Sequence, residues 1–193
     1  MKIDLNHNWK KLTPDDGHYF FGYYDRNPWN RDVTRHLVMK IPQITRLPER
    51  GERAEIGLLD LNGNYEPLTT TRAWCHQQGC MELFLKHRPD CFIYNDYEES
   101  ENRLVARIFQ LGKGVVGRYE LPVYAMSPDG KWAVSLNFSR IPRRGYSYAD
   151  AVLSEDPHPA DPDSDGIWLM NLESGKTELI VSYRKMMELH PYA

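Results

Sequence analysis

The chain has 193 residues, of which 41% are hydrophobic, 12% aromatic and 26% charged, and its formal net charge is -3. These values are typical of an ordinary globular protein of one or at most two domains. The chain is not basic enough to indicate a nucleic-acid partner, and no stretch approaches the roughly 18 uninterrupted apolar residues of a membrane-spanning helix. We therefore expect neither nucleic acid nor a membrane as a partner.

The N-terminal segment MKIDLNHNWKKLTPDDGHYFFGYYD lacks the apolar core of a signal peptide, which predicts a cytoplasmic location. The chain contains 3 cysteines, an odd number and too few for a disulfide framework. Cysteines that stay reduced also fit the reducing environment of the cytoplasm.

A repeat organises most of the chain. Three segments combine a short apolar strand, a polar residue, a leucine and a turn with glycine, and a second strand-like run follows each of them. These pairs are IGLLDLNGN with YEPLTTT, ARIFQLGKG with VVGRYELP, and IWLMNLESGK with KTELIVSY. We predict three β-hairpins of one design, with glycine where the turn requires a positive φ.

Each hairpin is preceded by another aromatic or β-branched strand that a turn introduces, within NPWNRDVTRHLVMKI, HRPDCFIYND and SPDGKWAVSLNFSRI. The unit thus occurs three times, at approximately 19–71, 81–122 and 123–183. Repeats of about 40 residues built from short strands are typical of propeller blades. We predict an all-β, β-propeller-like fold with about three to four antiparallel blades in a single domain, residues 1–193. In the tail YRKMMELHPYA, Met186, Met187 and Leu189 are expected to form a short helix-like cluster.

Propellers close with roughly four to eight blades, so three clear blades and a strand from HYFFGYYD leave the ring incomplete. We expect the chain to be a fragment of a longer protein. The alternatives are a ring completed by another chain and a shorter, sandwich-like stack of sheets. An open sheet edge favours pairing with a second copy, which predicts a homo-oligomer.

Five segments carry a family resemblance: HYFFGYYDRNPW, TTTRAWCHQQGCM, FIYND, YAMSPDGKWAVSLNFSRI and DGIWLMNLESGKTELI. Together, from His18 to Tyr183, they resemble the N-terminal half of TolB-like or WD40-like propellers related to oligogalacturonide lyases. SPDGKW is a generic blade motif, whereas FGYYD and QQG are more specific. The resemblance implies β-elimination, in which a divalent metal or an arginine neutralises a uronate carboxylate while a histidine or tyrosine removes the adjacent proton. It also implies that most metal ligands lie in later blades, so a divalent metal is expected only in a full-length protein.

The segment RAWCHQQGCM, residues 72–81, leads from an outer strand towards the axis of the predicted propeller, where ligands usually bind. His76 is a candidate base, and Gln77 and Gln78 could hold sugar hydroxyls or a carboxylate, with Trp74 beside them. The alternative is structural, with Trp74 packed between blades and the two amides satisfying backbone groups of the loop.

A second candidate loop is SRIPRRGYSYAD, residues 139–150, which directly follows a predicted strand. Arg143 and Arg144 match a carboxylate because the guanidinium group binds it through two hydrogen bonds. Tyr146 and Tyr148 could stack on sugar rings or act as the catalytic acid. The alternative is a solvated basic loop without a ligand.

Two further residues complete the predicted site. His18 opens HYFFGYYD and is the second candidate base, and Asn95 lies beside Asp96 at the end of FIYND, the equivalent strand end of the middle repeat. The sequence thus predicts a carbohydrate-active propeller that acts on or binds uronate-containing oligosaccharides, as a polysaccharide or oligosaccharide lyase if it is catalytic. The alternative function is a non-catalytic scaffold that binds a protein or a sugar ligand through the same aromatic residues.

Metal and thiol sites are weaker interpretations. Cys75, His76 and Cys80 approach the spacing of zinc ligands, but adjacent side chains converge poorly on one tetrahedral ion. A cysteine nucleophile needs a base within hydrogen-bond reach. His76 does not suit Cys75 in this role, because neighbouring side chains of an extended strand point to opposite faces. DPDSDG, residues 161–166, imitates the first half of a calcium loop, but Leu172 stands where a calcium-binding Glu is expected. We predict no metal site in this chain.

Overall fold

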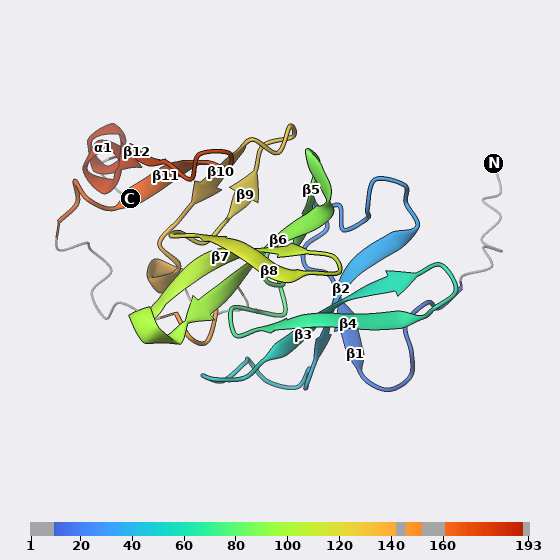
Figure 1. Ribbon diagram of the computed structural model, residues 1–193. Coiled ribbons are helices and arrows are strands. Elements are labelled where there is room, and N and C mark those ends of the chain that lie inside the picture. The colour runs from blue at the N-terminus through green and yellow to red at the C-terminus, as the bar shows by residue number, and fades with distance from the viewer. Residues whose placement is uncertain (1–9, 142–145, 152–160, 191–193) are drawn as a thin grey trace, which may run out of the picture.

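The computed structural model describes residues 10–141, 146–151 and 161–190. Within these ranges the chain forms three four-stranded antiparallel sheets, and the strands of each sheet are neighbours in the order in which the sequence supplies them. Figure 1 shows the three sheets following one another through the molecule. The predicted all-β class is confirmed.

The strands have the following bounds. The first sheet contains β1 (His18–Phe20), β2 (Arg35–Ile41), β3 (Ala54–Asp60) and β4 (Tyr65–Thr71). The second sheet contains β5 (Leu83–Leu85), β6 (Arg88–Glu98), β7 (Arg103–Gln110) and β8 (Gly114–Tyr119). The third sheet contains β9 (Ala125–Met126), β10 (Trp132–Ser135), β11 (Gly166–Asn171) and β12 (Thr177–Ser182). The helices are η1 (Glu99–Glu101), η2 (Phe138–Arg140) and α1 (Tyr183–Leu189).

The three predicted hairpins are confirmed as β3–β4, β7–β8 and β11–β12, each an antiparallel pair. Gly63, Gly112 and Gly175 lie in their turns with φ of 91°, 76° and 72°. A side chain at these positions would be strained, so glycine fixes the place where each strand reverses. The short helix expected in the tail is α1, and the Ser182 side chain caps it by accepting a hydrogen bond from the Lys185 amide.

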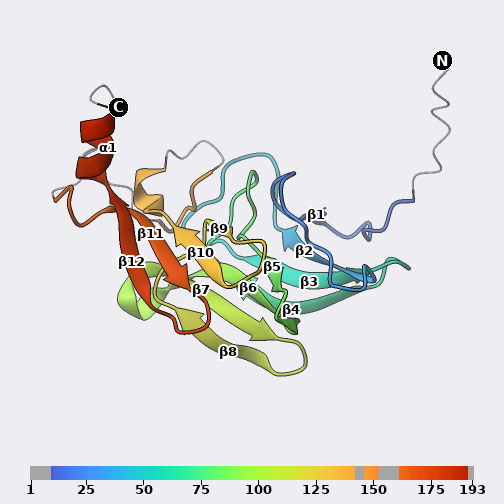
Figure 2. The ribbon, with the colours of Figure 1, turned by 90° about the horizontal axis from the view of Figure 1, so that it is seen from above.

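The middle sheet is covered on both faces by the other two sheets. Successive residues of β6 point to opposite faces of this sheet. Phe92 and Tyr94 belong to the core that the first and second sheets share. Cys91 and Ile93 belong to the core that the second and third sheets share. Residues 91–97 of β6 are therefore all buried. Figures 1 and 2 agree on this arrangement, with the second sheet between the other two.

The first strands of the sheets, β1, β5 and β9, are edge strands, and β4, β8 and β12 form the opposite edges. We call the edge with β1, β5 and β9 the inner edge of each sheet. The turn end of the molecule comprises the connections from each first strand to the second, residues 21–34, 86–87 and 127–131. The linker end comprises the connections at the other ends of the strands, residues 42–53, 72–82, 99–102, 120–124, 136–141 and 146–151. In the described part of the chain, no helix has the length and apolarity needed to cross a membrane.

Candidate functional site

Segments that are distant in the sequence meet at the inner edges of the three sheets. Arg26 follows β1, and its Nη2 donates a hydrogen bond of 2.8 Å to the carbonyl oxygen of Tyr124, the residue before β9. Gln78 precedes β5, and its Nε2 lies 3.4 Å from the hydroxyl oxygen of Tyr124. Glu82 immediately precedes β5, and Arg26 acts electrostatically on its carboxyl group. We call Arg26, Gln78, Glu82 and Tyr124 the inner-edge cluster.

Two glycines allow the chain segments of this cluster to approach closely. A Cβ atom on Gly22 would lie 2.8 Å from the carbonyl oxygen of Gln78, and one on Gly79 would lie 2.9 Å from Oε2 of Glu82. Both glycines also have positive φ, 101° and 65°. Gly79 closes a tight turn with Cys75 through two backbone hydrogen bonds of 3.0 and 3.1 Å. Any larger residue at either glycine would separate the two loops.

Glu82 is the most unusual titratable group of the cluster, with an exposed fraction of only 2%. Its Oε2 accepts hydrogen bonds from the backbone amide of Cys80 at 3.0 Å and from the Cys80 thiol at 3.1 Å. Its Oε1 has no hydrogen-bond partner among the described residues. Burial raises the pKa of Glu82 to about 7, although these hydrogen bonds and Arg26 oppose the shift. The carboxyl group therefore gains and loses its proton near neutral pH.

A cavity of about 700 Å³ opens beside Arg26 at the turn end, and we call it the turn-end pocket. In the part of the chain that the structure describes, its charged lining residues are Arg26, Arg31 and Lys86 against one carboxylate, Asp25. Nε of Arg26 lies 3.4 Å from the Asp25 carboxylate. The apolar lining includes Trp29, Leu83, Phe84, Leu85 and Met126. Residues of all three sheets or their turns thus contribute to one pocket with a positive charge balance.

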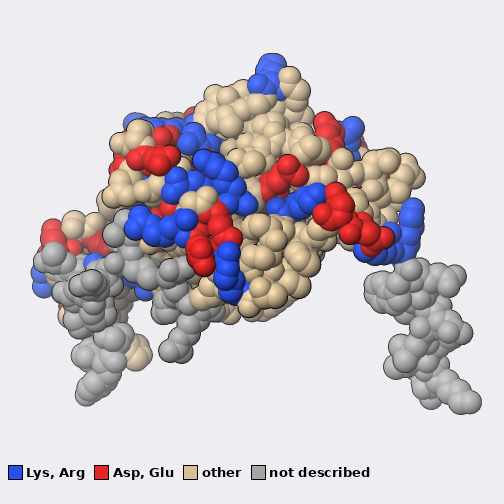
Figure 3. Space-filling view, turned by 90° about the horizontal axis from the view of Figure 1, so that it is seen from below, with Lys and Arg blue, Asp and Glu red and all other residues tan. Residues whose placement is uncertain are grey.

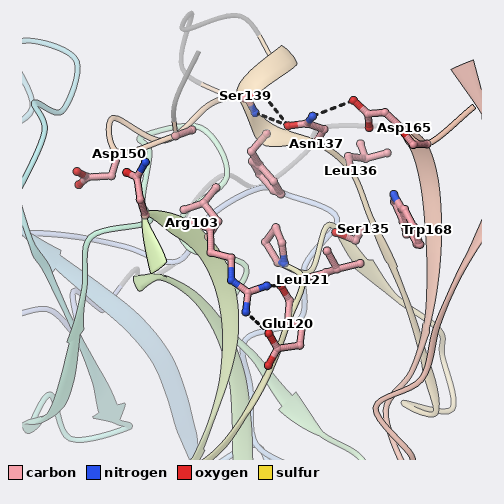
Figure 4. Close-up of a pocket in the computed structure, with 16 residues that line it drawn as sticks. Arg103, Glu120, Leu121, Ser135, Leu136, Asn137, Ser139, Asp150, Asp165 and Trp168 are labelled. Carbon is pink, nitrogen blue, oxygen red and sulfur yellow. Dashed lines mark hydrogen bonds and ion pairs between the residues drawn. The ribbon is translucent and has the colours of Figure 1, made fainter. Parts of the chain in front are cut away.

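A second cavity, of about 690 Å³, lies at the linker end between the second and third sheets, and we call it the linker-end pocket. Figure 4 shows its side chains, with Trp168 on β11 and the ion pair of Arg103 with Glu120 along its wall. Asn137 donates to Asp165 across 2.9 Å. Among the described residues, the charged groups that line it are one arginine and three carboxylates: Arg103, Glu120, Asp150 and Asp165.

Each of these carboxylates has an arginine partner. Asp165 accepts a hydrogen bond of 2.7 Å from Nε of Arg140, and Glu120 pairs with Arg103. Asp150, which is fully buried, accepts hydrogen bonds of 3.1 and 2.6 Å from the guanidinium group of Arg72. In Figure 3, which views the molecule from below, Lys and Arg side chains likewise lie next to Asp and Glu side chains. Charges near the linker-end pocket are therefore largely balanced within the protein.

The structure places His76 and Trp74 against the first sheet. Nε2 of His76 lies 3.1 Å from the backbone oxygen of Gln43, and its ring packs edge-on to Trp74 at 5.3 Å. Trp74 is fully buried in the core between the first two sheets and donates from Nε1 to the carbonyl oxygen of Glu52 at 3.0 Å. Neither residue lines the pockets described above. The alternative interpretation of Trp74 as a packing residue matches this geometry.

Tyr148 and Asn95 come together, as a buried structural pair. Tyr148 is fully buried, its ring stacks on Phe138 at 4.7 Å, and burial raises its pKa. Nδ2 of Asn95 lies 3.0 Å from the Tyr148 hydroxyl, and the Asn95 amide forms two 2.7 Å hydrogen bonds to the backbone of Val123. Asn95 thus fixes the chain that leads into β9. Neither side chain is open to a solvent-borne ligand.

The remaining predicted residues are dispersed. Gln78 joins the inner-edge cluster, and Gln77 is half-buried in the same turn. Tyr146 is 38% exposed and packs near Tyr23, with 6.5 Å between ring centroids. His18 is exposed at the start of β1. Arg143 and Arg144 lie outside the described residues.

The thiols are buried and protonated. Burial raises the pKa of Cys75 to about 11 and also raises that of Cys80, so neither is an activated nucleophile. Across the described ranges, no three His, Cys, Asp or Glu side chains gather as metal ligands. In the segment that resembles a calcium loop, Asp163 binds Arg184 and Asp165 binds Arg140. These carboxylates face arginines instead of converging on one ion.

Sequence reasoning missed Arg26, Glu82, Trp168 and the pair of Arg72 with Asp150. One signal for Glu82 was present, because it is a single charged residue inside the run CMELFL. Charged residues are seldom fully buried without a partner, so a carboxyl group in such a run indicates a special environment. No family model, curated protein or solved structure matches the chain.

Proposed function

We propose that the three sheets are consecutive blades of a β-propeller and that the turn-end pocket binds a uronate-containing oligosaccharide. The observation that carries this proposal is the set of three cations, Arg26, Arg31 and Lys86, against one carboxylate in a cavity of about 700 Å³. This volume falls within the range of ordinary ligand pockets.

Two features support the propeller assignment. Each sheet is a four-stranded antiparallel meander, which is the build of a propeller blade. The sheets also pack face to face through shared cores, and their inner edges meet at the contacts of Tyr124 with Arg26 and Gln78. A common centre lined by inner edges is where a propeller holds its ligand.

The chemistry of the turn-end pocket suits an acidic sugar. An arginine binds a carboxylate through parallel hydrogen bonds, and a lysine adds a compact positive charge. Trp29 offers an aromatic surface, and its ring is held edge-on to His36 with 4.8 Å between centroids. A sugar ring can lie against such a surface while its carboxylate reaches the cations. A neutral sugar would gain the stacking contact but not the charge interaction.

Calorimetric titration with trigalacturonate tests this proposal. We expect binding by the wild type and an affinity roughly tenfold lower in the double variant Arg31→Gln with Lys86→Gln, because two exposed pocket cations are removed. The matched control is Arg53→Gln with Lys113→Gln, which removes exposed cations outside the pocket. The proposal fails if trigalacturonate does not bind, or if its carboxyl-reduced form binds equally well.

A further inference from the structure

Trp168 is a large aromatic residue that is only partly buried where the third sheet faces the second. Its neighbour across the ladder, Ser135, and the next residue on the same face, Met170, are buried. Trp168 instead lines the linker-end pocket, and Figure 4 shows its indole beside the space that Leu136 and Ser135 also border. An indole in a cavity of about 690 Å³ offers an aromatic face to a ligand.

The polar groups beside Trp168 are fixed before any ligand arrives. Oδ1 of Asn137 accepts hydrogen bonds from the backbone amide and hydroxyl of Ser139 at 3.1 and 2.6 Å. Nδ2 of Asn137 donates to Asp165, which Arg140 also holds. Asp165 stands three residues before Trp168 in the chain. Because these groups are already oriented, a ligand that hydrogen-bonds to them loses little free energy in ordering them.

The charge pattern selects the kind of ligand. The carboxylates that line the pocket have arginine partners, since Asp150 pairs with Arg72, Asp165 with Arg140, and Glu120 with Arg103. A free anion would meet three carboxylates, and a free cation would compete with the arginines that these carboxylates already bind. A neutral molecule with hydroxyl donors avoids both costs, because a paired carboxylate still has lone pairs that accept hydrogen bonds.

We propose that the linker-end pocket is a second ligand site, which binds a neutral pyranose unit stacked on Trp168 and hydrogen-bonded to Asn137 and Asp165. A pyranose ring combines an apolar C–H face for the indole with equatorial hydroxyls for the polar pair. The site lies at the opposite end of the sheets from the turn-end pocket and does not depend on the function proposed there.

Titration with cellotriose and maltotriose, with trigalacturonate for comparison, tests this site. We expect at least one neutral trisaccharide to bind and to quench the fluorescence of Trp168. Trp168→Ala should lower the affinity at least tenfold, because loss of an aromatic contact at the centre of a site is among the largest single effects. The matched control is Trp132→Ala, which removes a 41% exposed tryptophan of β10 that does not line the pocket.

A second variant protects the test against misfolding of Trp168→Ala. The side chain of Asn137 is exposed, so Asn137→Ala should fold normally and lower the affinity severalfold. The variant Arg31→Gln with Lys86→Gln should bind the neutral trisaccharide as the wild type does. The proposal is overturned if neither trisaccharide binds at about 10 mM, a concentration sufficient for even a weak single-sugar site. Binding that survives both Trp168→Ala and Asn137→Ala, or trigalacturonate binding that both variants weaken, overturns it as well.

Discussion

The two ends of the same three sheets carry cavities of nearly equal volume, about 700 and 690 Å³, with opposite charge balance. At the turn end, three cations face one carboxylate. At the linker end, three carboxylates face one arginine among the described lining residues, and arginines outside the pocket hold two of these carboxylates. The packing of the three sheets therefore creates both pockets. The charged residues of the connecting segments determine which kind of ligand each pocket can bind.

The largest expected effect concerns the buried ion pair of Arg72 with Asp150, a residue that lines the linker-end pocket. Arg72→Met leaves Asp150 as a buried carboxylate without the guanidinium group that hydrogen-bonds to it, because Arg50 comes no closer than 4.0 Å. We expect a loss of about 3–5 kcal/mol in the free energy of unfolding. Urea denaturation measures this loss. Arg46→Met is the control, because Arg46 binds Glu52 on the surface with its side chain 45% exposed, and such pairs contribute about 1 kcal/mol or less. Equal losses in the two variants would show that the pair does not hold this end together.

The next effect concerns the inner-edge cluster beside the turn-end pocket. The pKa of Glu82 is about 7 in the folded protein against an ordinary value of 4.5. The folded state therefore retains the proton to higher pH than the unfolded state, and stability falls as the pH rises from about 4.5 to about 7. The shift corresponds to about 3 kcal/mol. Urea denaturation across this range should show that Glu82→Gln lacks this decline, and parallel profiles for variant and wild type would contradict the expectation.

A third test reverses one charge in the turn-end pocket alone. Arg31→Glu should lower the affinity for trigalacturonate roughly tenfold, about 1.4 kcal/mol, because the ligand carboxylate then meets a second acidic side chain. Binding of a neutral trisaccharide to the linker-end pocket should not change. Calorimetric titration of both ligands into this variant and into Arg53→Glu makes the comparison. An equal effect of Arg31→Glu on both ligands would mean that the two pockets are not independent.

The smallest expected effect distinguishes the pockets without mutation. Raising the salt concentration from about 0.1 M to about 1 M shortens the screening length from about 10 Å to about 3 Å. The affinity for trigalacturonate should then fall severalfold, whereas the affinity for a neutral trisaccharide should stay constant. Fluorescence titration at both salt concentrations measures the difference. A neutral ligand that loses affinity in parallel would contradict the charge contrast between the two ends.

The sequence predicts the strands and hairpins of this fold because their signals are local. Alternating apolar residues and the glycines at 63, 112 and 175 specify each hairpin without knowledge of the rest of the chain. The edge strands β5 and β9 are different, because three and two residues are too few to show a period. They form because β6 and β10 offer them a backbone edge, which only the assembled sheet provides.

The candidate site was predicted less completely because side-chain direction depends on tertiary contacts. The residues of the turn at 75–79 separate, with His76 directed to the backbone oxygen of Gln43 and Gln78 to Tyr124. Tyr146 is exposed, whereas Tyr148, two residues later, is fully buried on Phe138. The spacing of these residues in the sequence does not show which side chains point into the protein and which point to solvent. The contacts of His76 with Gln43 and of Tyr148 with Asn95, which fix these directions, come from distant segments.

The alternation along β6 has a consequence for how the molecule comes apart. Neighbouring residues of this one strand belong to different cores, so displacing it disturbs both contacts between sheets at once. A sheet that were joined to its neighbours only by flexible connections could melt separately. Because β6 belongs to both cores, the three sheets should unfold together. Heating should therefore produce a single cooperative transition instead of stepwise unfolding of one sheet after another.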